Sequence, residues 1–187
     1  MAEEQSFSNL VETMRKTAAA LREADLPFLL GGGMAAWARG GPESNHDVDF
    51  LMKHDDAERA LEDLRSAGFE PERPPENWLF KVWDGEVFVD LIFDTAAGPV
   101  TDELFERSDE LEVHAVRMKV AALEDVVVAK LCALDEQDLD YRSCLEVARS
   151  LREQIDWKAV RARTEGSPYA RAFFTLLREL EIVDVDA

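Results

Sequence analysis

Apolar residues follow two different periods along the first two thirds of the chain. In residues 8–24 they recur every three or four positions, as on one face of a helix, and Pro27 ends that pattern. The apolar run at residues 27–30 leads into three glycines, which is typical of a buried strand that enters a tight turn. The later segments predict a short helix at residues 34–39, a strand at 46–52, a helix at 55–69, a proline-rich loop at 70–77, a β-hairpin at 78–94 around Asp84-Gly85 and a strand at 111–118.

From residue 122 onward the pattern is helical throughout. The expected helices occupy residues 123–136, 140–154, 156–163 and 167–180. A boundary therefore falls near residue 120, with mixed helices and strands before it and helices alone after it. A length of 187 residues suits one domain with a small appended lobe.

Composition and charge exclude several classes of protein. Hydrophobic residues make up 47% of the chain, enough for a buried core, and no apolar run approaches the roughly 18 residues of a membrane span. The net charge of −19 repels a phosphate backbone, so extended nucleic-acid binding is not expected. The first ten residues lack the basic and apolar regions of a signal peptide, and we expect a cytoplasmic protein with two reduced cysteines. A local basic patch could still form from Arg142, Arg149, Arg152, Arg161 and Arg163.

Two aspartates, Asp47 and Asp49, lie two residues apart on the strand expected at residues 46–52. Side chains two apart on a strand point to the same face, about 7 Å from each other. Their carboxylates repel unless a cation lies between them, and hard divalent cations prefer such oxygen ligands. The alternative is a solvent-exposed strand face that carries two acids.

A third aspartate, Asp90, interrupts the otherwise apolar run Val87–Phe93. An ionised carboxylate in a strand buried on both faces is costly without a partner. A neighbouring strand that presents Asp47 and Asp49 to one metal cluster would explain it, and a lone aspartate at a sheet edge is the alternative. Three carboxylates on adjacent strands match a two-metal site, whose ions about 3.5–4 Å apart hold the attacking and leaving oxygens of a phosphoryl transfer.

The glycine run Gly31–Gly33 precedes these aspartates, with thirteen residues between Gly33 and Asp47. Glycine lets the backbone approach a ligand closely, and the N–H groups of the turn and of the helix expected near Met34 would form an anion site. The combination of the glycine turn with the three aspartates predicts a site for a metal and a phosphate.

An apolar residue, Gly-Gly, a short gap and Asp-x-Asp on the next strand are the signature of the DNA polymerase beta-like nucleotidyltransferase superfamily, which this sequence resembles. The motif is carried here by Leu30, Gly32-Gly33 and Asp47-Val48-Asp49, with Asp90 as the third carboxylate. Over residues 25–150 the chain looks most like the minimal bacterial branch, which includes antibiotic nucleotidyltransferases and abortive-infection toxins.

The resemblance implies an α+β fold with a small mixed β-sheet and flanking helices. This nucleotidyltransferase-like core would span residues 1–120, and a C-terminal helical lobe over residues 121–187 would pack on it.

The resemblance also implies a metal-dependent nucleotidyltransferase, which moves a nucleoside monophosphate from an NTP to a hydroxyl acceptor with two Mg²⁺ ions. Asp47, Asp49 and Asp90 would be the catalytic residues and metal ligands. Gly32 and Gly33 would hold the triphosphate, although many relatives have Gly-Ser there. The acceptor stays open between a small molecule, a protein hydroxyl and a tRNA end.

Two further residues are candidates for binding the NTP. Ser44 offers a hydroxyl close to the Asp pair, but Glu43 stands near where relatives often carry a base. Lys130 lies within the apolar stripe of its expected helix, so it either extends to solvent or contacts a phosphate, and relatives often carry a lysine on this helix.

Two other functions stay open beside the enzyme. Glu43 and the missing serine are compatible with a catalytically inactive binding module of the same fold. The branch also includes toxins, so the chain could be the toxin component of a toxin–antitoxin pair, with an antitoxin protein as its partner.

Overall fold

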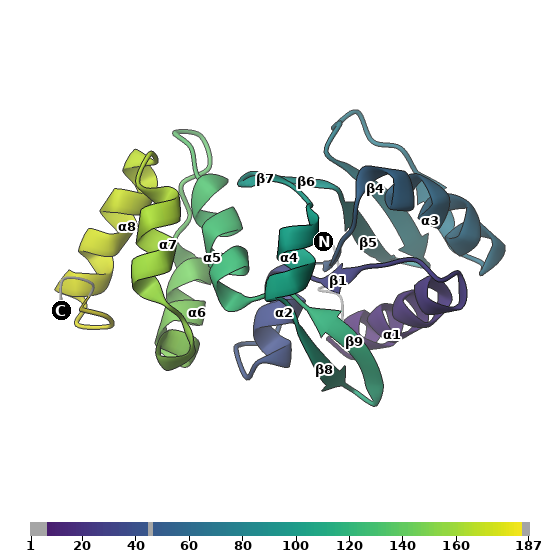
Figure 1. Cartoon of the computed structure of the whole chain (residues 1–187), viewed down its shortest axis with the longest axis horizontal. Coiled ribbons are helices and arrows are strands. Elements are labelled where there is room, and N and C mark those ends of the chain that lie inside the picture. The colour runs from purple at the N-terminus through teal and green to yellow at the C-terminus, as the bar shows by residue number, and fades with distance from the viewer. Residues whose placement is uncertain (1–6, 45–46, 185–187) are drawn as a thin grey trace.

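The computed structural model describes residues 7–44 and 47–184, which form a mixed β-sheet with helices packed on it and a group of helices beside it (Figure 1). The α-helices of the described residues are α1 (Phe7–Glu23), α2 (Gly32–Ala38), α3 (His54–Ser66), α4 (Asp102–Arg107), α5 (Leu123–Cys132), α6 (Arg142–Leu151), α7 (Trp157–Thr164) and α8 (Pro168–Glu179), with a short 3-10 helix η1 (Arg152–Gln154) after α6. The strands are β1 (Leu29–Leu30), β2 (Val48–Leu51), β3 (Glu70–Glu72), β4 (Leu79–Asp84), β5 (Val87–Ile92), β6 (Asp94–Thr95), β7 (Gly98–Pro99), β8 (Asp109–Val113) and β9 (Val116–Val120). The expected α+β fold with a mixed sheet is confirmed.

Three expectations for the elements were wrong. The proline-rich loop contains β3, an edge strand that pairs with β4 and tolerates Pro71 because an edge strand leaves one side unpaired. The strand expected at residues 111–118 is a hairpin, β8 and β9, whose turn residues His114 and Ala115 have φ of 46° and 64°. The small β6–β7 hairpin and α4 were not expected at all, because both are too short for a periodic pattern.

The sheet has the order β3-β4-β5-β2-β1-β9-β8. Strand β2 pairs in parallel with β5 and antiparallel with β1, and β1 pairs in parallel with β9. This order makes β2 and β5 neighbours in the sheet, although 35 residues separate the end of β2 at Leu51 from the start of β5 at Val87. The two candidate acidic strands are therefore direct neighbours.

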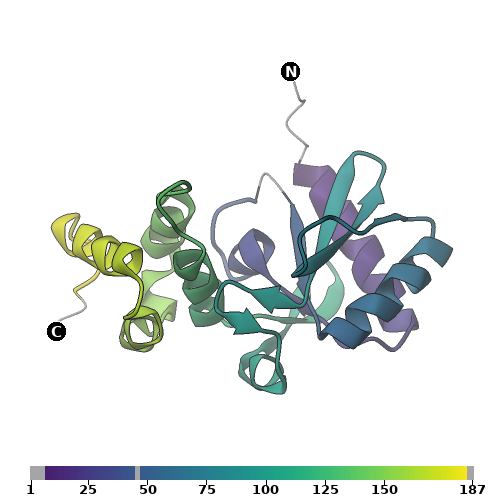
Figure 2. The same cartoon turned by 90° about the horizontal axis from the view of Figure 1, so that it is seen from above.

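Helices α1 and α3 lie together on one side of the sheet (Figure 2). The fully buried side chains of Val48, Phe50, Val89 and Leu91 belong to the hydrophobic core that these helices share with the sheet. Because side chains alternate along a strand, the residues between them, Asp49 and Asp90, point to the other face.

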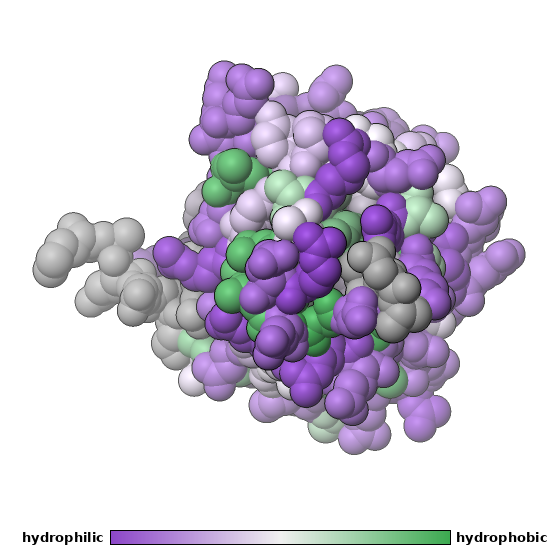
Figure 3. All heavy atoms as spheres, turned by 90° about the vertical axis from the view of Figure 1, so that its left-hand side faces the viewer, coloured by the Kyte–Doolittle hydropathy of each residue, from purple (hydrophilic) through white to green (hydrophobic). Residues whose placement is uncertain are grey.

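A second hydrophobic cluster joins the helices α5 to α8, with Leu131, Val160 and Phe173 fully buried in it. Figure 3 faces these helices and shows mostly hydrophilic side chains around a central group of hydrophobic ones. A division of the chain at residue 120 into two domains stays a prediction. None of the described helices has the length and apolarity that crossing a membrane demands.

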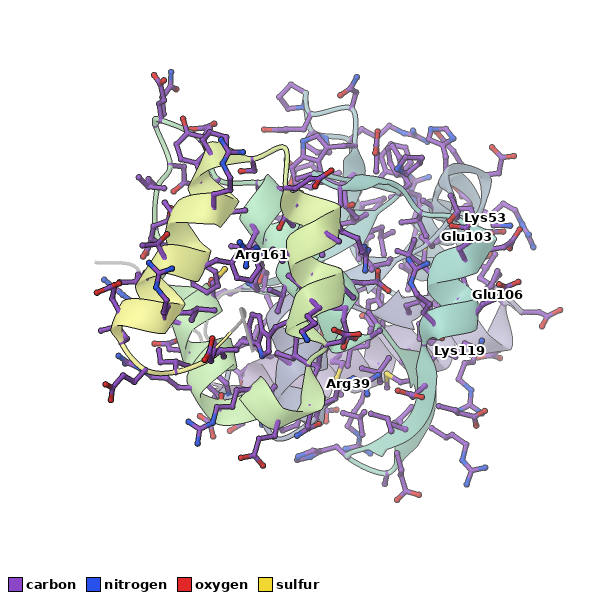
Figure 4. The ribbon with its side chains drawn as sticks, turned by 60° about the vertical axis from the view of Figure 1, so that its left-hand side comes forward. Arg39, Lys53, Glu103, Glu106, Lys119 and Arg161 are labelled. Atoms are coloured by element: carbon purple, nitrogen blue, oxygen red, sulfur yellow. The ribbon has the colours of Figure 1, made fainter. Side chains whose placement is uncertain are left out.

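Arg39 connects the end of α2 to the junction between the sheet and the helical group (Figure 4). Its guanidinium donates hydrogen bonds to the carbonyl oxygens of Val120 and Ala121, both at 3.1 Å, and pairs with Asp109 at 2.9 Å. The side chain is only 12% exposed, so these contacts hold the chain just before α5 against the helix that begins with Gly32.

Candidate active site

Three carboxylates converge on the open face of the sheet. Asp49 on β2 stands directly opposite Asp90 on β5 in the parallel register, and Asp47 lies just before β2. Each residue offers one carboxylate oxygen, and these three atoms all lie within 4.8 Å of one another. The structure thus brings together the three aspartates that the sequence singled out.

Asp90 has a partner that sequence reasoning missed. Lys81 on β4 pairs with Asp90 across the antiparallel ladder, and its Nζ donates to Asp90 Oδ1 at 2.6 Å. The alternative of a lone aspartate at a sheet edge is therefore wrong, because β5 lies between β4 and β2 and Asp90 has a partner on β4. The hairpin was predicted, but a turn at Asp84-Gly85 would have placed Lys81 opposite Phe88. The observed pairing of Asp84 with Val87 moves the turn by one residue, to Gly85-Glu86, and so brings Lys81 opposite Asp90.

The environment of the cluster disfavours ionised carboxylates. Burial, followed by the charges of Asp47 and Asp90, raises the pKa of Asp49 well above its usual range, and Lys130 and Lys81 oppose the rise. Burial also raises the pKa of Asp90, with the Lys81 ammonium acting against it. A bound divalent cation would favour the ionised forms of both groups.

Gly32 lies directly against the acidic cluster. Its φ is +51°, and a Cβ atom built there would lie 1.6 Å from Asp49 Oδ2. A Cβ atom on Gly33 would lie 2.6 Å from Ser44 Oγ, so the three expected residues Gly32, Gly33 and Ser44 do share one corner of the structure with Asp49. Only glycine allows the backbone at position 32 to approach Asp49 so closely.

A cavity of about 820 Å³ opens from Gly32 and Asp49. Lys130 on α5 lines it, and the charge of Lys130 acts on Asp49. Lys130 is half-buried, so its side chain faces the cavity and not bulk solvent alone. Trp78, 42% exposed, lines the same cavity.

Two arginines line the same cavity from α4 and α7. Arg107 and Arg163 both bind the carboxylate of Asp125, which lies in the first turn of α5. Arg161, labelled in Figure 4, lines a separate groove with Arg171 and Arg178 of α8. Arg161 and Arg163 therefore line different hollows, and Arg142, Arg149 and Arg152 line neither of the two.

Comparison with protein families finds one match over nearly the whole chain. The model of a family described as "Uncharacterised nucleotidyltransferase" matches residues 5–181. No curated protein matches the sequence.

Several solved structures share the fold. The crystal structure of ANT(2'')-Ia in complex with adenylyl-2''-tobramycin has a TM-score of 0.64 at 15% identity, and the match covers 87% of this chain and 98% of that one. A solution structure of ANT(2'')-Ia has a TM-score of 0.65 at 15% identity and covers 93% of this chain and 97% of that one. JHP933 from Helicobacter pylori has a TM-score of 0.57 at 16% identity, with 93% and 78% covered. At these identities the likeness concerns the fold.

Proposed function

Because the chain belongs to this nucleotidyltransferase family, as its glycine and aspartate motif indicated, we propose that it transfers a nucleoside monophosphate from an NTP to a hydroxyl acceptor, with a divalent cation at Asp47, Asp49 and Asp90. The observation that carries this proposal is the convergence of the three carboxylates beside Gly32, with Asp49 lining a cavity that Lys130 also lines. An inactive module that binds no metal ion would not need these groups to converge.

The acidic cluster fits a cation such as Mg²⁺. It offers only oxygen ligands, from three side chains whose oxygens lie within 4.8 Å of one another, and magnesium prefers carboxylates together with substrate phosphates. A cation bound there would neutralise charge that develops on the transferring phosphoryl group. The number of ions, two in our expectation, is part of the proposal.

The remaining residues position the NTP and the acceptor. The close backbone approach at Gly32 and Gly33 admits the triphosphate, Ser44 donates its hydroxyl, and Lys130 offers its ammonium group from α5. Asp90 Oδ1 is held by Lys81, which leaves Oδ2 for the site.

In the proposed transfer, one bond to the α-phosphorus of the NTP forms and another breaks. The acceptor hydroxyl oxygen forms a bond to the α-phosphorus of the NTP, the bond from that phosphorus to the bridging oxygen breaks, and pyrophosphate leaves. The hydroxyl proton passes to Asp90 Oδ2, the carboxylate oxygen that Lys81 does not bind. Catalysis then consists mainly of positioning and charge neutralisation, as is usual for phosphoryl transfer.

The acceptor we propose is a small hydroxyl compound. ANT(2'')-Ia, which shares the fold, is seen with adenylyl-2''-tobramycin, and its chain is covered almost completely by this one. The net charge of −19 argues against a long RNA as acceptor. The toxin–antitoxin interpretation stays a prediction, because neither the structure nor the comparisons test it.

The experiment is incubation of the purified protein with each α-³²P-labelled NTP, Mg²⁺ and the small-molecule fraction of a cell extract. We expect label to move to a new compound with release of pyrophosphate, and D47N/D49N to abolish the transfer. D63N, which changes an exposed aspartate on α3, should keep full activity. If D47N/D49N transfers label as fast as D63N, the three carboxylates are not the catalytic centre.

A further inference from the structure

The wall of the cavity formed by α4, α5 and α7 carries more positive charge than its buried carboxylate can balance. Arg107 donates from Nε and Nη2 to the two oxygens of Asp125 at 3.0 and 2.9 Å, and Arg163 Nη2 donates to Oδ1 at 2.5 Å. One carboxylate, 5% exposed, thus faces two guanidinium groups. Counted alone, these three groups carry one net positive charge, and the charges of Glu103 and Glu106 on α4 also act on Arg107.

Both arginines keep donors that are open to the cavity. A guanidinium has five N–H donors, and the bonds to Asp125 use two from Arg107 and one from Arg163. The two side chains are 41% and 36% exposed, and both line the cavity. Glu103, one turn before Arg107 on α4, lies 4.0 Å away with its side chain 80% exposed, a geometry in which an ion pair is weak.

The arginine cluster is set apart from the lysine that serves the donor nucleotide. Asp125 precedes Lys130 by five residues on α5, which is about 7.5 Å along the helix axis. Lys130 is one of the cations whose charge acts on Asp49, so it belongs to the metal and triphosphate end of the cavity. The cavity therefore holds two cationic centres, Lys130 near the carboxylates and the pair of Arg107 and Arg163 around Asp125.

We infer that Arg107 and Arg163 bind an anionic group, a carboxylate or a phosphate, on the acceptor whose hydroxyl receives the nucleotide. This inference rests on the proposed function and adds the chemical class of the acceptor to it. A guanidinium fork matches the planar or tetrahedral oxygens of such a group, and Asp125 holds both forks in place before the acceptor arrives. A cationic group placed against these two arginines would be repelled by them.

Inorganic phosphate is the probe for this subsite. Its binding is measured by thermal shift at constant ionic strength, first on the free protein and then on protein saturated with Mg²⁺ and a non-hydrolysable NTP analogue. We expect a saturable rise in melting temperature in both states, because a ligand that binds the native state stabilises it. In R163Q the phosphate affinity should fall by about tenfold, or about 1.4 kcal/mol, while R163K should lie between R163Q and wild type.

The variants separate binding from folding. R163Q leaves Asp125 with its two bonds from Arg107, so the buried carboxylate stays paired. R59Q removes an arginine from α3 whose pair with Asp56 is at the surface, and its phosphate response should equal that of wild type. Equal phosphate affinities of R163Q and R59Q would overturn the inference.

Two further outcomes are distinguishable. If phosphate binds only in the absence of the NTP analogue and R163Q weakens the analogue itself, the arginines hold a phosphate of the donor, and the acceptor assignment is wrong. If the analogue gives no Mg²⁺-dependent shift in wild type, the proposed function fails, and the phosphate titration still decides whether this anion site exists.

The transfer assay identifies the acceptor class directly. Small molecules from a cell extract are first separated on an anion exchanger, and each fraction is then offered to the enzyme with labelled NTP. Label should enter a compound of the retained fraction, and R163Q should raise the KM for that fraction without raising the KM for the NTP. Labelling of the unretained fraction alone would overturn the inference.

Discussion

Lys81 Nζ lies 2.6 Å from Asp90 Oδ1, between two strands that pair these residues directly. The two side chains are 23% and 9% exposed, and the ammonium also lies 4.4 Å from the centroid of the Phe88 ring. The third carboxylate of the acidic cluster thus has a counter-ion within the sheet, whether or not a cation is bound.

Removal of Lys81 should destabilise the chain. K81M leaves the mostly buried Asp90 carboxylate without its partner, and we expect the free energy of unfolding at neutral pH to fall by about 2–4 kcal/mol. The measurement is urea denaturation in EDTA. K16M breaks the more exposed pair between Lys16 and Asp84 at the end of the same strand and should cost clearly less than K81M. A similar loss in the two variants would show that the Lys81 pair has no special weight.

The stability of the metal-free chain should depend on pH through Asp49. Its folded-state pKa is raised above the unfolded value of about 3.9, so the folded state gains from protonation. That contribution is fully present below the unfolded pKa and is lost as pH rises through the folded pKa. We expect D49N to gain stability relative to wild type between about pH 4 and pH 7 in EDTA, and Mg²⁺ with an NTP analogue to stabilise wild type alone. Unfolding curves that differ by a constant amount at every pH would contradict this account.

The close approach of Gly32 to Asp49 should be essential to the site. A Cβ atom at position 32 would lie 1.6 Å from Asp49 Oδ2, so G32A must displace the carboxylate or the turn. We expect G32A to lose both the Mg²⁺-dependent thermal shift and the transfer activity. Gly40 also has a positive φ, +93°, but nothing lies within 4 Å of its Cβ position. G40A should therefore lose about 1 kcal/mol of stability and keep its activity, and an inactive G40A would refute the steric explanation.

Lys130 should contribute to transfer and not to stability. K130M keeps the length and packing of the side chain but removes the ammonium group, and we expect the transfer rate to fall by at least about tenfold, or 1.4 kcal/mol of transition-state stabilisation. Single-turnover kinetics with labelled NTP measure the effect, and K158M, at an exposed position on α7, is the matched control. Unchanged activity in K130M together with equal or higher stability would identify Lys130 as a lysine that only extends to solvent.

Local patterns in the sequence determined the acidic strand and the glycine turn. Val48 and Phe50 are apolar and Asp49 between them is not, so a strand that buries the first two must present Asp49 on its other face, because neighbouring side chains alternate. Gly32 and Gly33 were recognisable in the same way, since a backbone that lacks a Cβ atom marks a turn or a close approach wherever the chain later folds.

The tertiary structure decided which groups meet across the sheet and the cavity. Asp125 binds Arg107, 18 residues before it, and Arg163, 38 residues after it, and no local period relates these positions. Such contacts depend on how α4, α5 and α7 pack against one another, and that packing is set by the burial of two hydrophobic clusters formed from the whole chain. The acidic cluster depends on both the local pattern and the tertiary structure. Alternation along each strand orients Asp49 and Asp90, and only the parallel pairing of β2 with β5 brings them opposite each other.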